Sequence, residues 1–397
     1  MIRKIAAALL LGIAPSVFAD DLPVDTIAAP DATPAADTIA PAPTKFYERG
    51  IIGKVYNYFR ESNREHPDKR FDMSFIGGPH FSSEEGFGLG VAGSGLYRAG
   101  NFENRSTPLS NVTLKLDVTT GQMYKIACEG YHIFEGDRHR INYDVYFYSF
   151  VDKWWGIGYA QNSVDSNECK YKRLQSQATV DYVFKFGRGL FVGPIAQFSY
   201  VNARDFRKPE LLGDRRDRVF ALGAGLTFYL DTRDIPTAAT RGVYLRLNAM
   251  GHPSWLANKE PFTLVEATAS FYKTVWSGGV LAMNAHTRLT WGDTPWCLLS
   301  TFGGNTMRGY WEGRYRDRKE ADITVELRQH VWRRNGIAVW VGAGEVFPRF
   351  SAFTMRHVLP NFGVGYRWEF KKGVNVRLDV GFGKGEKGFN FSLNEAF

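Results

Sequence analysis

Hydrophobic and polar residues alternate with a period of two along most of the chain from residue 71 onward. The alternation is clearest in segments 112–118, 322–331 and 374–382. In 322–331, for example, the apolar set is Ile323, Val325, Leu327 and Val331, and the polar set is Asp322, Thr324, Glu326, Arg328 and His330. Successive side chains of a β-strand point to opposite faces, so the pattern predicts strands with one apolar and one polar face.

The length and number of these segments indicate the kind of sheet they form. The pattern marks sixteen segments: 71–81, 86–98, 110–120, 123–134, 140–151, 172–185, 190–201, 217–230, 241–250, 263–276, 279–291, 319–333, 336–346, 363–371, 374–383 and 388–397. Most run for about 10 to 14 residues, whereas ordinary strands average about 5 to 6, and a tilted strand of about 9 to 11 crosses a bilayer. An even strand number is typical of bacterial single-chain barrels. We therefore expect an all-β fold, a 16-stranded antiparallel transmembrane β-barrel over residues 71–397.

The connections between the predicted strands support this interpretation. Those after even-numbered strands are mostly short, and one contains Asn335-Gly336, a strong hairpin turn signal. Long connections follow several odd-numbered strands, at 152–171, 202–216, 251–262, 292–318 and 347–362, while 99–109 is longer than the rule expects. Short periplasmic turns and long outer loops are typical of outer-membrane barrels. Tryptophans near strand ends fit interfacial belts: Trp154, Trp155, Trp276, Trp291, Trp332 and Trp368.

The first 70 residues have a different organisation. Residues 1–19 combine a basic start, a short apolar run and Val17-Phe18-Ala19, which predicts a cleaved secretory signal peptide. Residues 20–45 form a linker rich in Pro and Ala, and residues 46–70 are predicted to be a short N-terminal amphipathic helix and its connector. That helix could lie on a membrane, plug a pore or cap the barrel. We expect the protein in the bacterial outer membrane.

Composition and motifs exclude several classes of protein. The formal net charge is +8, aromatic residues make up 15% and there are 41 Gly but only 3 Cys, which excludes a disulfide scaffold. The chain has no HExxH, P-loop or CxxC motif. We expect no enzyme activity, cofactor, metal site or nucleic-acid partner, and we interpret His286 and Arg288 as polar residues lining the lumen. The excess Lys and Arg of the loops would face lipopolysaccharide phosphates.

The long connection 292–318 carries the most specific motif. It contains Phe302-Gly303-Gly304-Asn305-Thr306 followed by Met307-Arg308-Gly309-Tyr310. The last four residues resemble the [V/L]-R-G-[F/Y] motif of the BamA/TamA superfamily, the bacterial surface antigen family of outer-membrane assembly and secretion barrels. In that family the motif lies in a loop between strands eleven and twelve of sixteen, which is its place here. The segment 231–242 similarly resembles the family's periplasmic turn after strand eight.

The resemblance implies that this loop folds into the lumen and that Arg308 contacts an acidic residue of the wall. Alternation places Glu326 on the lumenal face, so we expect the pair Arg308–Glu326, with Glu345 and Glu312 as alternatives. The chain departs from the family in two ways. Gly342 occupies a position that is often acidic in the family, and residues 20–70 leave no room for the POTRA domains that usually precede the barrel.

Two strands are expected to form the seam of the barrel. The first contains Gly77, Gly78 and Pro79, and because Pro donates no ladder hydrogen bond and Gly weakens a strand, the seam should be imperfect. A bulge at Pro79 is the alternative. The last predicted strand has Phe389, Phe391, Leu393 and Phe397 on one face, and its aromatic end resembles the assembly signal of outer-membrane barrels.

The family resemblance implies a function in the insertion, assembly or translocation of proteins, with lipids as a further cargo, at the outer membrane. Unfolded or secreted client proteins, outer-membrane lipids and lipopolysaccharide, and a periplasmic accessory protein would be its partners. The alternatives on the same fold are a passive channel and a structural surface antigen.

Overall fold

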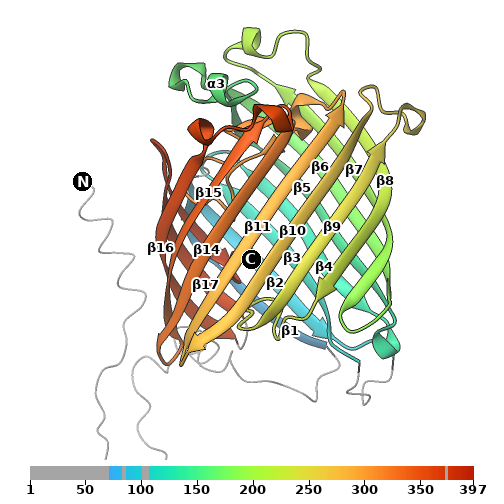
Figure 1. Ribbon diagram of the computed structural model, residues 1–397, viewed down its shortest axis with the longest axis vertical. Helices are drawn as coiled ribbons and strands as arrows, with labels where there is room; N and C mark the ends of the chain where they lie inside the picture. Colours follow the sequence, from blue (N-terminus) through green and yellow to red (C-terminus); the bar gives the residue numbers. More distant parts are fainter. Residues whose placement is uncertain (1–70, 83–85, 101–106, 372–373) are drawn as a thin grey trace, which may run out of the picture. The chain divides into compact units, whose positions relative to one another are not determined.

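The computed structural model describes residues 71–82, 86–100, 107–371 and 374–397. The signal peptide, the linker and the amphipathic helix predicted for residues 1–70 lie outside this part of the chain. Sixteen antiparallel strands form one sheet in which each strand pairs with the next along the chain, except that β11 pairs with β14. The sheet curls into a barrel with tilted strands, and its long loops gather at the upper end in Figure 1.

The strands closely follow the alternating segments. They are β1 (Phe71–Ser82), β2 (Gly86–Tyr97), β3 (Ser110–Thr119), β4 (Tyr124–Ile133), β5 (His139–Trp154), β6 (Cys169–Lys185), β7 (Leu190–Arg204), β8 (Arg218–Asp231), β9 (Gly242–His252), β10 (Phe262–Trp276), β11 (Gly279–Gly292), β14 (Lys319–Trp332), β15 (Asn335–Phe347), β16 (Leu359–Lys371), β17 (Val374–Phe382) and β18 (Lys387–Leu393). Two further strands, β12 (Ser300–Thr301) and β13 (Arg316–Asp317), pair with each other inside the loop between β11 and β14.

Helical structure is confined to the connections in the described part of the chain. There is one short α-helix, α3 (Tyr159–Asn162). The 3-10 turns are η2 (Glu135–Asp137), η3 (Asp165–Asn167), η4 (Pro209–Leu211), η5 (Ser254–Leu256), η6 (Trp296–Leu298), η7 (Phe350–Ala352) and η8 (Met355–His357). Among the described residues we found no helix with the length and apolar character needed to span a membrane.

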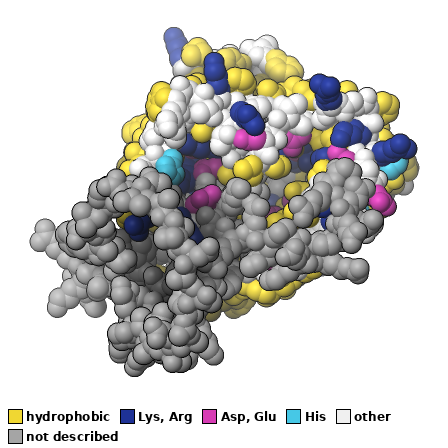
Figure 2. Space-filling view, turned by 90° about the horizontal axis from the view of Figure 1, so that it is seen from below, with side chains coloured by type: hydrophobic (Ala, Val, Ile, Leu, Met, Phe, Trp, Pro, Cys, Tyr) yellow, Lys and Arg dark blue, Asp and Glu magenta, His cyan; other side chains and the backbone are white. Residues whose placement is uncertain are grey.

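The apolar face of the sheet is the one that points outward. In β3, Leu114 and Leu116 are 51% and 54% exposed, and in β14 Ile323 is 48% exposed while its neighbour Thr324 is fully buried. A view into the barrel from the end with the short turns shows acidic, basic and His side chains inside the ring and hydrophobic ones along its outer edge (Figure 2). A soluble protein would bury the apolar face, so this arrangement is that of a barrel in lipid.

The ends of the sheet meet without forming a ladder. Cα atoms of β1 and β18 approach within 8 Å, but no hydrogen-bonded pairing joins the two strands among the described residues. A closed barrel therefore remains a prediction. The alternative of a bulge at Pro79 is wrong, because β1 pairs with β2 in one continuous register from Phe71–Tyr97 to Ser82–Gly86.

The last strand is shorter than predicted. It ends at Leu393, not at residue 397, because Asn394 adopts a left-handed backbone with φ 65° and turns the chain inward. Phe397 then packs beside Tyr272, whose side chain is buried. The alternation correctly describes Phe391, which is 40% exposed on the outer face, but it does not extend to Phe397.

The tryptophan prediction was correct for only some of the residues. Trp276, Trp291 and Trp332 are between 40% and 53% exposed, as an interfacial belt requires. Trp154 and Trp155 are buried instead, and Trp154 belongs to an apolar cluster that includes Trp296 of the loop between β11 and β14. The cluster lies at the end of the barrel that carries the long loops.

We predict that charge on the outer face destabilises the barrel much more than charge in the lumen. Val341, near the middle of β15, is 61% exposed on the outer face. Val341→Lys should cost about 2–4 kcal/mol in urea unfolding from lipid vesicles, because a cation would enter hydrocarbon. Gln197→Lys is the matched control, since Gln197 bonds within the polar face to Thr179, and equal losses would contradict the assignment of faces.

Candidate functional site

The loop between β11 and β14 folds back into the barrel. Its two ends are joined by the short strands β12 and β13, and next to them Phe302 N–H donates to the carbonyl of Tyr315 at 2.9 Å. Between these strands, side chains of the loop form one buried cluster with the barrel wall: Phe302, Met307, Tyr310, Tyr315, Val346 and Leu359. Burial of this apolar surface compensates part of the entropy lost in ordering a long loop.

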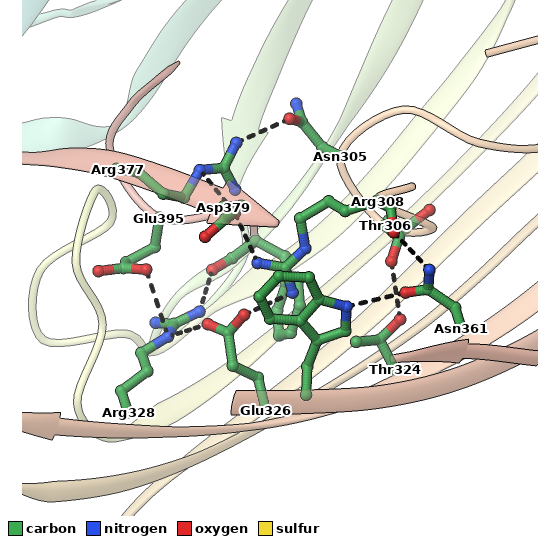
Figure 3. A network of polar contacts seen from close by, with 12 residues as sticks. Asn305, Thr306, Arg308, Thr324, Glu326, Arg328, Asn361, Arg377, Asp379 and Glu395 are labelled. Atoms are coloured by element: carbon green, nitrogen blue, oxygen red, sulfur yellow. Dashed lines mark hydrogen bonds and ion pairs between the residues drawn. The ribbon is translucent and has the colours of Figure 1, made fainter. Parts of the chain in front are cut away.

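Arg308 is the centre of the site. Its side chain is 1% exposed and donates from Nη2 to Glu326 Oε2 at 2.5 Å and from Nη1 to Asp379 Oδ2 at 2.9 Å. The guanidinium also lies over the ring of Trp340, 3.6 Å from its centroid. Figure 3 shows the side chain extended between the two carboxylates, which belong to β14 and β17. One planar cation thus links the loop to two strands of the wall.

The same carboxylates serve three other arginines. Arg328 Nε donates to Glu326 at 2.7 Å, and Arg367 donates to Asp379 at 2.6 Å and, through Nε, to Glu395 at 2.8 Å. Arg377 lies 3.4 Å from Asp379 and donates to Asn305 of the loop at 2.9 Å. The network is therefore shared between the loop, three strands and the segment that follows β18 (Figure 3).

The network gathers several charges in a small, largely buried space. Four arginines (Arg308, Arg328, Arg367 and Arg377) face three carboxylates (Glu326, Asp379 and Glu395), and Arg328 also donates to the carbonyl oxygen of Phe397 at 3.1 Å. Buried charges are costly unless they are paired, so removing one carboxylate would leave an uncompensated cation. The arrangement favours one position of the loop, because Arg308 reaches both of its carboxylate partners only in this geometry.

The backbone of the loop approaches the wall where only glycine fits. Gly309 has φ 115°, in the region that favours glycine, and a Cβ on it would lie 2.5 Å from the carbonyl carbon of Gly381 in β17. A Cβ on Gly381 would lie 2.0 Å from the carbonyl oxygen of Arg308. Gly388 of β18 completes the contact, with its Cβ position 3.2 Å from Gly309 Cα. The loop therefore rests on the bare backbone of the last two strands.

Tyr310 ties the loop to the start of β16 and to the connection between β17 and β18. Its hydroxyl donates to the carbonyl of Pro360 at 2.6 Å and accepts from the N–H of Lys384 at 2.7 Å. Burial raises the pKa of Tyr310 to about 12, so the phenol stays protonated and remains a donor at physiological pH. Glu386 accepts from the N–H of Trp311 at 2.8 Å, and burial raises the pKa of its carboxyl.

The structure brings together most of the residues singled out in the motif. Met307 is buried in the apolar cluster, and Gly303 and Gly304 have φ values of 121° and 67° where the loop turns beside Glu312. Of the three candidate partners of Arg308, the structure places Glu326 against it. Glu345 instead accepts from the N–H of Thr354, and the carboxylate of Glu312 lies beside Gly304.

Asp379 is a partner of Arg308 that the motif did not indicate. It lies on β17, far from Glu326 in the sequence, and the loop side chain joins the two. Alternation in 374–382 already placed Arg377 and Asp379 on the polar face, but it does not show which lumenal groups meet. Glu395 was missed for another reason, since it lies beyond the point where the last strand turns inward.

The fold and the site together define a class of protein: an outer-membrane β-barrel whose longest outer loop is pinned inside the lumen. Comparison with solved structures agrees with this class. BamA from Haemophilus ducreyi lacking POTRA domains 1–3 superposes with a TM-score of 0.55 at 12% identity, covering 82% of this chain and 70% of that one.

CdiB from Escherichia coli superposes with a TM-score of 0.56 at 8% identity, covering 83% of this chain and 64% of that one. CdiB from Acinetobacter baumannii gives 0.51 at 10% identity, covering 82% of this chain, which spans 60% of that CdiB. The sequence matches no family profile and no curated protein. At these identities the likeness shows the fold, which is the one implied by the loop motif.

We predict that Arg308→Ala releases the loop without unfolding the barrel. In this variant Glu326 would still be paired with Arg328, and Asp379 with Arg367. The free energy of unfolding should therefore fall by less than the about 3–5 kcal/mol that a fully unpaired buried charge costs. If the free energy needed to open the loop falls by about 1.4 kcal/mol, the rate of trypsin cleavage at Arg314 should rise about tenfold. Arg308→Lys should be intermediate, because an ammonium cannot bridge two carboxylates as a guanidinium does. Unchanged cleavage of Arg308→Ala would contradict this anchoring role.

Gly381→Ala should displace the same loop without removing the side chain of Arg308. The added methyl group would overlap the carbonyl of Arg308, and overpacking of this kind costs about 1–3 kcal/mol. Gly251→Ala in β9 is the matched control, since no heavy atom lies within 4 Å of its Cβ position. Trypsin cleavage at Arg314 measures both, and equal rates for the two variants would show that the backbone contact does not hold the loop.

Proposed function

We propose that this protein is an outer-membrane barrel that assists the insertion, assembly or translocation of client proteins. Its fold is shared with BamA and CdiB barrels, and its outward face is apolar. The function requires no bond-making chemistry, so we propose a non-enzymatic role. The clients would be unfolded or secreted proteins, with outer-membrane lipids as the surrounding partner.

The observation that carries the proposal is the position of the pinned loop beside the open ends of the sheet. Gly309 rests on Gly381 and Gly388, and Arg308 binds Asp379, so the loop contacts both of the last two strands. The last of these strands, β18, meets β1 without a described ladder. A change in the loop would therefore alter the edge at which a client strand could pair.

An edge of this kind is suited to strand addition. Unpaired N–H and C=O groups on an edge strand can accept the backbone of another chain, which is β-augmentation. Gly77, Gly78 and Pro79 lie in β1, and Pro79 has no N–H to contribute to a ladder with β18. These residues favour a seam that a client strand could open.

The outer mouth offers a surface for lipopolysaccharide. A cavity of about 540 Å³ there is lined by the cations Lys153, Lys170, Lys172 and Arg207 together with Asp205 and Trp311. Lys172 is paired with Asp205 and Lys153 with Glu168, so phosphate groups would find their charge partners in Lys170 and Arg207. A separate periplasmic protein would deliver clients, as a further part of the proposal.

The proposal predicts that the barrel in liposomes accelerates the folding of a small unfolded client barrel. Wild type should exceed empty liposomes about tenfold or more, which corresponds to a barrier lowered by about 1.4 kcal/mol. Arg308→Ala and Gly381→Ala should both lose this acceleration, and Gly251→Ala should retain it. Folding of the client is followed by its resistance to protease and by its shift on gels without heating.

Two outcomes would contradict the assembly function. If wild type gives the rate of empty liposomes, the barrel alone does not insert clients. If all variants accelerate equally, the pinned loop has no part in the activity. Single-channel conductance tests the rival function, because a large conductance that is insensitive to Arg308→Ala, without client folding, would identify a passive channel.

A further inference from the structure

A second cluster of charged groups, two of them buried, lies in the lumen on the wall formed by β10, β11 and β14. His286 Nδ1 is 3.1 Å from Glu320 Oε2 and 3.7 Å from Asp322 Oδ2, and its Nε2 is 3.5 Å from Glu266 Oε1. Glu320 and Asp322 are 1% and 7% exposed. One imidazole nitrogen thus faces two buried carboxylates, and the other faces a third.

The three groups have the spacing of ligands around one metal ion. One ligand atom from each of His286, Glu320 and Asp322 lies within 4.8 Å of the others. With metal–ligand distances of about 2.0–2.2 Å, the ligands of a tetrahedral ion are about 3.3–3.6 Å apart. The distances of 3.1 and 3.7 Å from His286 Nδ1 fall on either side of that range. A cation could bind here with only small side-chain shifts.

The carboxylates have oxygens left to bind an ion. Glu320 Oε1 and Asp322 Oδ1 are buried and have no hydrogen-bond partner within the described residues. Unpartnered buried oxygens are costly, and a divalent cation held between the two carboxylates would offset their negative charge. This second observation distinguishes the cluster from an ordinary patch of acidic residues.

Glu266 is placed to orient the imidazole. Its carboxylate faces His286 Nε2, so a proton on that nitrogen would leave the lone pair of Nδ1 directed at Glu320 and Asp322. A metal-binding His usually has such a carboxylate behind it. Arg288 lies 3.4 Å from Glu266 and balances its charge, which leaves the pair Glu320–Asp322 for the ion.

We propose that His286, Glu320 and Asp322 form a binding site for a divalent transition-metal ion, with Zn²⁺ as the reference ion. An imidazole with two carboxylates suits Zn²⁺ or Mn²⁺ better than Ca²⁺, which prefers oxygen ligands throughout. The proposal departs from our expectation that the chain holds no metal site. No motif indicated it, because its ligands come from two strands and become neighbours only through the register that pairs His286 with Asp322.

The site is connected to the pinned loop. Thr306, two residues before Arg308, donates its hydroxyl to Asp322 Oδ2 at 3.0 Å, and its carbonyl accepts from Thr324 at the same distance. An ion that holds Asp322 would therefore also hold the start of the loop motif. This inference does not depend on the proposed function, since ion binding is measured without a client.

The test is titration of the full-length barrel, folded in detergent and treated with chelator, with ZnCl₂ in a calorimeter. We expect one ion per chain with a Kd of micromolar or lower, and X-ray absorption with one nitrogen and two carboxylate groups as ligands. His286→Gln and Asp322→Asn should weaken binding at least about 100-fold, and Glu266→Gln about 10–100-fold, as found for groups that orient a ligand. The gel shift on heating verifies that each variant is folded.

The matched control is His330→Gln, because His330 is exposed and bonds to the carbonyl of Arg333, away from the carboxylates. It should bind Zn²⁺ as wild type does. The proposal is overturned if wild type binds neither Zn²⁺ nor Mn²⁺, which would leave His286 as a protonated partner of the three carboxylates. It is also overturned if His286→Gln binds as tightly as wild type. Zn²⁺ should slow trypsin cleavage at Arg314 in wild type but not in Asp322→Asn.

Discussion

The contact of the Arg308 guanidinium with Glu326 and Asp379 determines where the longest loop of the barrel lies. The two carboxylates belong to β14 and β17. These strands are separated in the sheet by β15 and β16, so they share no backbone hydrogen bonds. Because water is largely excluded around the guanidinium, alternative positions of the loop would leave charges without partners. The apolar cluster around Phe302 and Tyr315 adds binding energy, but it is the charge pattern that selects one position.

The outer and inner faces of the barrel wall differ in both polarity and exposure. Its outer face is hydrophobic and exposed, and its inner face is polar and, around the loop, almost fully buried. The buried inner face is possible because acids and bases are interleaved on neighbouring strands, so that each charge meets partners across a strand or from the loop. The two charge clusters, around Arg308 and around His286, are joined through Thr306 and Asp322.

Much of the barrel could be predicted from the alternation of apolar and polar residues in the sequence. Particular residues show which features this alternation could not predict. Alternation placed Glu326 in the lumen and located most strand ends within about three residues. It could not find β12 and β13, which are too short to show a period, or the inward turn at Asn394, which depends on one backbone angle. It also could not pair Glu326 with Asp379 or His286 with Glu320, because those contacts depend on the register of the sheet and on the path of a loop.

The two strands at the seam are held very differently. At its outer end β18 has Gly388 against Gly309 of the loop, and just beyond its inner end Glu395 is bound by Arg367. β1 pairs with β2 alone among the described strands. If the seam opens, we expect β18 to keep its place and β1 to move together with β2, because β18 is also held by the loop and by the bond of Arg367 to Glu395.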